Sequence, residues 1–351
     1  MRPLVKPALR RQWLDAETLQ LGTDPAVAVV LTGLSHGTRA VLDLLDGERT
    51  EVEVRHAAAD AGVMDHHVDR LLDTLLRAGA LEDADSADPL ADLPFLQRAR
   101  LREELAELSL RTSRPGAAAE ALGRRQQARV SVRGAGRVGA PLVALLAAAG
   151  TGAVAVVDPA PTRPQDVMPA GLREHDIGCP RDEAAVRGVS GATRRRRADG
   201  AEEDDLVVLA QSAMTDLSLP EQLRRNGVPH LVVTALDGAG VIGPLVRPGV
   251  SACVRCLHLH RHDRSRYQSN AGSPAGTPAG TPAGMDGADG AGCALVMATA
   301  ALAAIQILAF LDAQAAPVRL ATVDGTVELR PPDWRLRRRT WPPHPDCGCI
   351  D

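Results

Sequence analysis

The sequence predicts an α/β fold that follows a small N-terminal domain of short strands and helices. The chain has 351 residues, 45% of them hydrophobic, which is enough for two or three domains with ordinary buried cores. Residues 18–84 show short apolar runs and then helical patterns, whereas the chain from residue 128 reads strand, glycine turn, helix and strand. We therefore expect domains at 1–84 and 128–351, joined by a helical connector over 85–127.

The N-terminal domain is predicted from two strand-like runs and three helical segments. Thr18–Leu21 and Ala26–Leu31 flank the turn sequence GTDP, a pattern typical of a β-hairpin. Apolar residues then recur at helical spacing over 41–45, 52–59 and 68–76. A short sheet with three helices is the arrangement of a winged helix-turn-helix.

The rest of the chain is predicted to alternate between strands and helices, with one low-complexity interruption. Residues 94–110 carry apolar residues at helical spacing, so the connector is expected to contain a helix. The near-repeat SPAGTPAGTPAG within 270–292 has too little apolar surface to order itself, which predicts a flexible loop. The later elements expected are strands at Asp205–Leu209, His230–Thr234, Val318–Val323 and Thr326–Leu329, and helices at Leu217–Asn226 and 293–313.

The charge balance and the N-terminal sequence exclude several classes of function. The chain carries 40 Lys and Arg against 44 Asp and Glu, a formal net charge of -4, so no general attraction to nucleic acid or anionic membranes is expected. The N-terminal residues lack the apolar core of a secretory signal, and no stretch of about 18 apolar residues predicts a membrane span. We expect a cytoplasmic protein, in which paired cysteines indicate metal or redox chemistry more than structural disulfides.

A glycine motif directly follows the first predicted strand of the α/β domain. Gly134, Gly136 and Gly139 form G-x-G-x-x-G before a helix, and Asp158 ends the next strand. Such glycines let a phosphate approach the helix N-terminus, while the carboxylate accepts hydrogen bonds from ribose hydroxyls. The pattern predicts a Rossmann-like domain. The same glycines would also close a tight turn in a fold that no longer binds nucleotide, and both interpretations stay open.

Two close pairs of cysteines have the spacing of a zinc site. The C-x-x-C and C-x-C pairs can supply four thiolates to one tetrahedral ion, which makes a closed structural site, and their members are Cys253, Cys256, Cys347 and Cys349. A redox C-x-x-C and unrelated free thiols are the alternatives. Cys179 and Cys293 have no neighbouring cysteine and are expected to be small buried residues. The alternating histidines from His258 to His262 indicate either an exposed strand or a basic approach to a site.

The α/β domain resembles the ThiF-type relatives of ubiquitin-activating enzymes. The resemblance spans Ala128 to Asp351 and rests on the glycine turn, Asp158, the segment DIGCPR ending at Arg181, and the two cysteine pairs. The phrases GVPHLVV, GPLVRPGVSACVRCLHLHR and HPDCGC are similar to actinobacterial ThiF-like proteins of ribosomal peptide modification clusters, which are described as leader-peptide-binding or cyclodehydratase-associated. The resemblance implies a precursor leader peptide, a partner YcaO-type cyclodehydratase and a homodimer.

The N-terminal domain is similar to the PqqD-like recognition element that is fused to such proteins. In that family the leader peptide adds as a strand to the small sheet and lies against the third helix, so that main-chain hydrogen bonds give affinity and side-chain pockets give selectivity. The resemblance implies a peptide-binding edge and helix face made by Val27, Val29, Leu31, Val68, Leu72 and Leu75. The alternative is that these apolar residues are simply core.

Several departures from the family pattern bear on ATP and magnesium. Active members adenylate a carboxylate with an Asn-Leu-x-Arg-Gln segment, a Lys and a magnesium-binding Asp, whereas Arg181 stands at the Lys position here and Leu206–Ser212 ends without an Asp-Asn pair. Arginine cannot replace the compact ammonium of lysine, and a missing carboxylate removes a metal clamp. We therefore expect a peptide-binding scaffold with no assigned catalytic residue. The alternatives are an adenylyltransferase that uses Arg181, and a DNA-binding regulator, which the acidic third helix disfavours.

Overall fold

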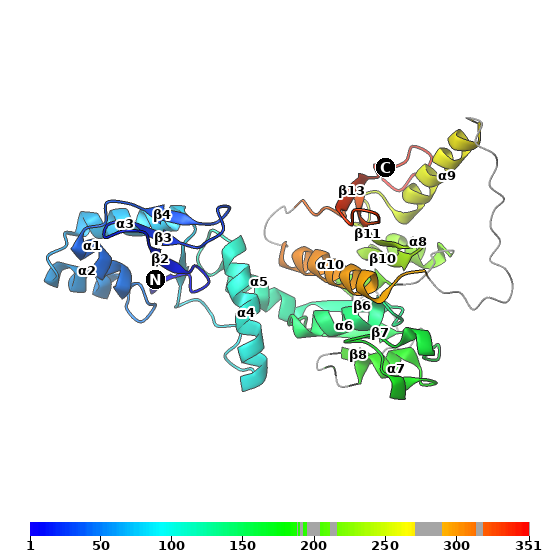
Figure 1. The fold of residues 1–351 in the computed structure, drawn as a ribbon, viewed down its shortest axis with the longest axis horizontal. Coiled ribbons are helices and arrows are strands. Elements are labelled where there is room, and N and C mark those ends of the chain that lie inside the picture. The colour runs from blue at the N-terminus through cyan, green and yellow to red at the C-terminus, as the bar shows by residue number, and fades with distance from the viewer. Residues whose placement is uncertain are drawn as a thin grey trace. The chain divides into compact units, whose positions relative to one another are not determined.

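The structure, a computed structural model, describes residues 1–187, 189, 192–194, 204–210, 216–270, 290–313 and 319–350. The chain forms two compact units, Met1–Arg124 and Arg125–Asp351, and each is described by itself (Figure 1). Most of the predicted connector over 85–127 therefore belongs to the first unit. The low-complexity segment predicted as a flexible loop falls within 271–289, which lies outside the described residues.

The first unit begins with two small antiparallel sheets. β1 (Pro3–Val5) pairs with β5 (Leu81–Asp83), and a three-stranded sheet has the order β2-β3-β4, with β2 at Arg11–Trp13, β3 at Leu19–Leu21 and β4 at Val29–Leu31. The pairing of β3 with β4 confirms the predicted hairpin. No strand pattern predicts β1, β2 or β5, because three residues are too few to show an alternation.

Three helices cover this sheet and share one hydrophobic core with it. They are α1 (His36–Leu44), α2 (Glu51–Asp60) and α3 (Asp65–Arg77). α2 begins at a capping box in which Thr50 and Glu53 satisfy each other's backbone N–H groups, and the Ser35 side chain caps α1. All three predicted helices are confirmed. The interpretation of this unit as a winged helix-turn-helix stays a prediction.

The connector consists of α4 (Phe95–Arg111) and α5 (Ala117–Gln127), which pack on a small core of their own around Leu101 and Leu122. Lys6 joins the end of α4 to the N-terminal sheet. Its buried Nζ donates hydrogen bonds to the Ser109 carbonyl at 2.5 Å and the Thr112 carbonyl at 2.6 Å. A cation at this end of a helix satisfies carbonyls that have no partner within the helix.

The second unit is built on an eight-stranded sheet of order β13-β12-β11-β10-β9-β6-β7-β8. The strands from β8 to β10 run parallel, and the remaining pairs are antiparallel. The strands are β6 (Arg129–Arg133), β7 (Ala153–Val157), β8 (Ala192–Arg194), β9 (Leu206–Leu209), β10 (His230–Leu236), β11 (Ala239–Val246), β12 (Gly325–Leu329) and β13 (Leu336–Thr340).

Helices lie on both faces of this sheet, because alternate residues of its central strands enter different cores. Leu206 and Val208 of β9 pack with α6 (Gly139–Ala148) and α10 (Cys293–Asp312), whereas Val207 and Leu209 pack on the opposite face with α8 (Ser218–Arg225) and the start of α9 (Val254–Asn270). α7 (Arg181–Val186) is short and packs beside α6. A mostly parallel central sheet with helices on both faces is the arrangement of a Rossmann-like domain.

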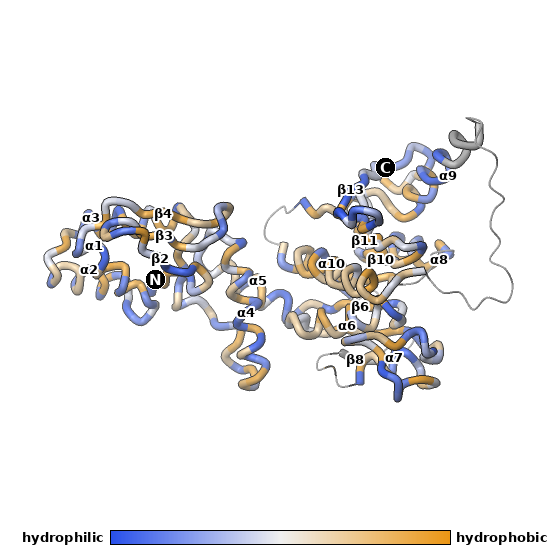
Figure 2. Tube along the Cα trace, in the orientation of Figure 1, coloured by the Kyte–Doolittle hydropathy of each residue, from blue (hydrophilic) through white to orange (hydrophobic). Residues whose placement is uncertain are grey.

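α10 is the one helix in the described part of the chain that is long and apolar enough to cross a membrane by length and composition (Figure 2). Its buried side chains, among them Ala300, Ala303 and Ile307, belong to the core under β10 and β11. A helix that is covered in this way is apolar because it packs on a sheet.

The strand expected over Val318–Val323 is wrong, and Cys293, which was expected to be buried, is exposed. Residues 319–323 form a turn, closed by a 3.2 Å hydrogen bond from the Val323 N–H to the Leu320 carbonyl, so the apolar run predicted as a strand is a buried turn. The histidines from 258 to 262 lie on α9, so the exposed strand is excluded. An alternation over five residues is too short to distinguish a strand from a helix.

Candidate functional site

The glycine turn joins β6 to α6 at the carboxyl end of the parallel strands. Gly134 has a φ of 103°, and a Cβ on Gly139 would lie 1.8 Å from the Gly134 carbonyl oxygen, so both positions require glycine. A Cβ on Gly136 would lie 3.3 Å from an Arg181 nitrogen. The first and third glycines thus shape the turn and the helix–strand packing, while the second faces Arg181.

Asp158 follows β7 and lies against the turn, with both carboxylate oxygens engaged by the protein itself. Oδ2 accepts a hydrogen bond from the Ala135 N–H at 2.8 Å and lies 3.0 Å from Arg181 Nε. Oδ1 accepts from Arg181 Nη2 at 3.2 Å and from the Ala160 N–H at 3.3 Å. The structure therefore brings Asp158 and Arg181 together at the glycine turn. A ribose hydroxyl would compete with Arg181 for the oxygens of Asp158.

Arg181 bridges a second buried carboxylate. Its Nη1 lies 3.5 Å from Asp166 Oδ2, and Asp166 is 6% exposed. Asp182 is also buried beside Asp158, whose N–H donates to Asp182 Oδ2 at 3.3 Å. Two carboxylates thus share one guanidinium, and a third lies beside Asp158, which is an unfavourable place for a triphosphate. The residues after Ala210, where the family's magnesium ligand is expected, lie outside the described part of the chain.

The four cysteines of the predicted metal site come together between β11 and the C-terminal segment. Cys253 Sγ lies 3.8 Å from Cys256 Sγ and 3.4 Å from Cys347 Sγ, and the Cys256 and Cys349 sulfurs are 3.3 Å apart. These distances exclude disulfides, whose bond is about 2.05 Å. Four sulfurs at the about 2.3 Å zinc–sulfur distance lie about 3.8 Å apart in a tetrahedron, and the four Sγ atoms lie within 4.8 Å of one another. The donor set therefore fits a metal such as zinc.

Groups around the cluster act on the protonation of its thiols. Burial acts to raise the pKa of Cys256, but N–H donors from His344 and Cys253 bring it below its usual value. Burial raises the pKa of Cys349 to about 11 and raises that of Cys347 further, and neighbouring sulfurs add to the effect. His344 is held beside the cluster by Asp263, whose carboxylate lies 2.9 Å from His344 Nε2. A bound cation would favour all four thiolates.

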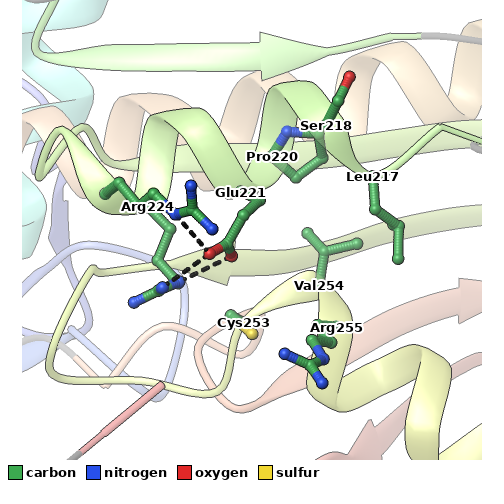
Figure 3. A pocket seen from close by; sticks show the side chains of 9 residues that line it. Leu217, Ser218, Pro220, Glu221, Arg224, Cys253, Val254 and Arg255 are labelled. Atoms are coloured by element: carbon green, nitrogen blue, oxygen red, sulfur yellow. Dashed lines mark hydrogen bonds and ion pairs between the residues drawn. The ribbon is translucent and has the colours of Figure 1, made fainter. Parts of the chain in front are cut away.

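A pocket of about 250 Å³ opens beside Cys253, between α8 and the first turn of α9 (Figure 3). Glu221 accepts hydrogen bonds from Arg224 at 2.8 Å and Arg225 at 2.9 Å, and the bond from Arg224 is the main cause that lowers the pKa of Glu221 to about 2. The hydrogen bond to Glu221 raises the pKa of Arg224, and nearby Cys253 and Cys349 add to the effect. The pocket therefore holds a guanidinium that lies close to two sulfurs of the cluster.

The comparison with protein families decides the identity of this fold. The model of the ThiF family matches residues 113–349, which is more than half of the chain. The chain belongs to the ThiF family. The match includes the glycine turn, Asp158 and the four cysteines, so the predicted superfamily is confirmed. A search by sequence finds no match among curated proteins.

Solved structures extend this ThiF-family similarity over the N-terminal unit. E. coli MccB with AMPCPP and selenomethionine MccA matches with a TM-score of 0.71 at 13% identity, over 99% of each chain. The microcin C7 biosynthetic enzyme MccB in complex with N-formylated MccA matches with a TM-score of 0.69 at 12% identity, again over 99% of each chain. Selenomethionine PaaA matches with a TM-score of 0.69 at 14% identity, over 97% of this chain and 100% of PaaA. At these identities the similarity shows a shared fold.

The residues predicted to contact a peptide occupy different environments in the N-terminal unit. Val27 precedes β4 and is 37% exposed, and Val29 is half-buried. Four others, Leu31, Val68, Leu72 and Leu75, are buried members of one core. Their side chains pack the sheet on the helices, which is the alternative considered above. β4 itself is an edge strand of its sheet, and Val30 at its centre is 52% exposed.

Two buried carboxylates between β7 and α7 escaped sequence reasoning. Asp166 and Asp176 end two R-x-x-D segments, and each carboxylate accepts a 2.9 Å hydrogen bond from the backbone N–H of the arginine three residues earlier. The repeated spacing is the signal that would have marked both turns. Asp182 carries no such signal, because it comes to lie beside Asp158 only when α7 packs against β7.

Proposed function

We propose that this ThiF-family protein binds the leader segment of a ribosomally made precursor peptide and presents the peptide to a YcaO-type cyclodehydratase that forms azolines. The N-terminal unit recognises the peptide, and the ThiF domain serves as a scaffold that does not adenylate. The observation that carries the proposal is the carboxylate of Asp158, which Arg181 and two backbone N–H groups already occupy. A scaffold keeps the fold of the family without its open nucleotide site.

The peptide-binding half of the proposal is supported by the free edge of β4. Within the described residues β4 pairs only with β3, so its outer main-chain groups are available to a further strand. The opposite edge, β2, is partly covered, because Arg39 of α1 lies 4.2 Å over the Trp13 ring and Arg11 pairs with Asp43 at 3.3 Å. The similar structure of MccB is described as a complex with N-formylated MccA, and by analogy this chain would also bind a separate partner.

The ThiF half of the proposal rests on charge and on the cysteine cluster. Asp158, Asp166 and Asp182 would oppose the phosphates of ATP, and Arg181 is already shared by two of them. Zinc held by the four cysteines would tie the start of α9 to the C-terminal segment, a structural role that needs no open coordination position. We also propose a homodimer, as the family resemblance implies.

A matched pair of variants tests peptide binding by the full chain. Gln12, Gln20 and Val30 are in register across the small sheet and face the same side. Val30→Glu places a charge on the β4 edge, and Gln12→Glu places the same charge on the β2 edge. With a fluorescein-labelled leader peptide and fluorescence polarisation, Val30→Glu should weaken binding about ten-fold or more, which corresponds to about 1.4 kcal/mol. Equal weakening by both variants, or no binding by the unaltered chain, would remove the β4 proposal.

The second candidate function is an adenylyltransferase in which Arg181 moves away from Asp158 when ATP binds. The observation in its favour is the whole-length similarity to MccB, which is described in a complex with AMPCPP. Calorimetric titration of ATP and magnesium into the full chain separates the two functions. The scaffold predicts no binding heat. Saturable binding that Asp158→Ala abolishes would favour the adenylyltransferase.

A further inference from the structure

A cluster of arginines gathers around one buried carboxylate at the β12 and β13 edge of the large sheet, far along the sheet order from the glycine turn. Glu328 of β12 is 2% exposed. Its Oε2 atom lies 2.8 Å from Arg330 Nε and 3.0 Å from Arg339 Nε, and its Oε1 accepts from Thr326 Oγ1 at 3.2 Å. A single carboxylate oxygen therefore holds two guanidinium groups, Arg330 by a hydrogen bond from its Nε and Arg339 by a close ion pair.

This geometry leaves the outer ends of both guanidiniums directed away from Glu328. Their side chains are 41% exposed for Arg330 and 48% exposed for Arg339, and among the described contacts their Nη groups have no carboxylate partner. An arginine whose Nε is engaged can still donate two parallel hydrogen bonds from its Nη groups to an oxyanion. Two such groups, anchored at one atom, form a preorganised pair of donors.

A third arginine, Arg261 of α9, lies within electrostatic reach of this group. Partial burial lowers the pKa of Arg261, the charges of Arg330 and Arg339 lower it further, and Glu328 raises it. Three positive charges thus share one negative charge. An additional anion at this point would relieve the repulsion between the guanidiniums.

The strand that carries Arg339 is also a free edge. β13 pairs with β12 and is the last strand in the order of the described sheet, and all five of its side chains are exposed. Charged residues on an edge strand also prevent unwanted strand pairing. That protective role needs exposed charges alone, and it does not account for two guanidiniums held at a single buried oxygen.

We propose that Arg261, Arg330 and Arg339 form an oxyanion clamp that docks an acidic, extended polypeptide segment along the free edge of β13. The carboxylates of the segment bind the clamp, and its main chain pairs with β13. The occupant is a polypeptide because the clamp adjoins free main-chain groups, which a small anion would leave unused. This surface is separate from β4, so it stands whether or not β4 binds a leader peptide.

The test is fluorescence anisotropy of the full chain with a labelled octapeptide of alternating Glu and Val. Arg261→Gln is the informative variant, because it removes one charge without leaving Glu328 unpaired, and Arg335→Gln is its control, because Arg335 is an 82% exposed arginine near the clamp that pairs loosely with Asp333. We expect saturable binding that Arg261→Gln weakens about five-fold and Arg335→Gln by less than about two-fold. Binding should also weaken when NaCl rises from about 50 to about 200 mM.

Three further probes distinguish the occupant. An octapeptide of alternating Lys and Val should not bind, because its charge is wrong. An octapeptide of alternating Glu and Pro should bind more weakly than the Glu and Val peptide, because proline cannot donate to a strand ladder. Three results would each overturn the proposal. They are equal binding of the Glu and Pro peptide and the Glu and Val peptide, complete displacement by about 10 mM inorganic phosphate, and equal losses in the two arginine variants.

Discussion

Replacing Arg181 by alanine should destabilise the ThiF unit, because it leaves two buried carboxylates without their shared cation. The side chains of Asp158 and Asp166 are 10% and 8% exposed, and the arginine that bridges them is 24% exposed. Removing one partner of a buried ion pair costs about 3–5 kcal/mol of unfolding free energy. Because Arg181 keeps part of its surface in water, we expect the lower end, about 3 kcal/mol.

Scanning calorimetry of the full chain measures this loss. In a unit of this size, 1 kcal/mol shifts Tm by about 2–4 °C, so Arg181→Ala should lower Tm by about 6–12 °C. Arg163→Ala is the control, because Arg163 is exposed on the same loop, and it should change Tm by less than about 2 °C. Arg181→Lys should recover part of the loss, since it restores the charge without the planar fork. Equal shifts in Arg181→Ala and Arg163→Ala would refute the view that Arg181 fills the site.

Further substitutions test the cysteine cluster, the buried His230 and the buried Lys6. Cys347→Ser should lower zinc content by elemental analysis and lower Tm, whereas Cys293→Ser, an exposed cysteine outside the cluster, should do neither. Burial lowers the pKa of His230 to about 4, so the unfolded chain binds the extra proton, and the unfolding free energy measured in urea should fall by up to about 3 kcal/mol as pH drops from about 7 to about 4. His230→Gln should remove most of this pH dependence, and an unchanged slope would contradict the assignment. Lys6→Met should cost about 3 kcal/mol, because Glu82 and two carbonyls lose their buried cation, and amine-reactive labelling of Lys6 should occur only after unfolding.

Local patterns predicted the elements whose signals lie within a few residues. The glycine turn, the long helical faces of α3 and α10, and the pairing of β3 with β4 follow from periodicity and turn chemistry. The four cysteines could be grouped because thiolates in two close pairs have few other uses in a reducing environment.

Contacts between distant segments were beyond the sequence. The charge of Glu328 acts on Arg261 across sixty-odd positions of chain, and no spacing rule anticipates that approach. Arg181 was identified as a departure from the family pattern, but its bridging of Asp158 and Asp166 needed coordinates. The Val318–Val323 segment misled for the opposite reason, because burial in a turn selects the same apolar residues as a strand does.

We propose that this ThiF-family protein captures a precursor peptide without activating a carboxylate. The most direct measurement is ATP–pyrophosphate exchange by the full chain with its cognate precursor peptide, at a concentration where fluorescence polarisation shows the peptide to be bound. If the protein is a scaffold, we expect the peptide to be bound and no exchange above background. Exchange that depends on the peptide and disappears in Asp158→Ala would contradict it.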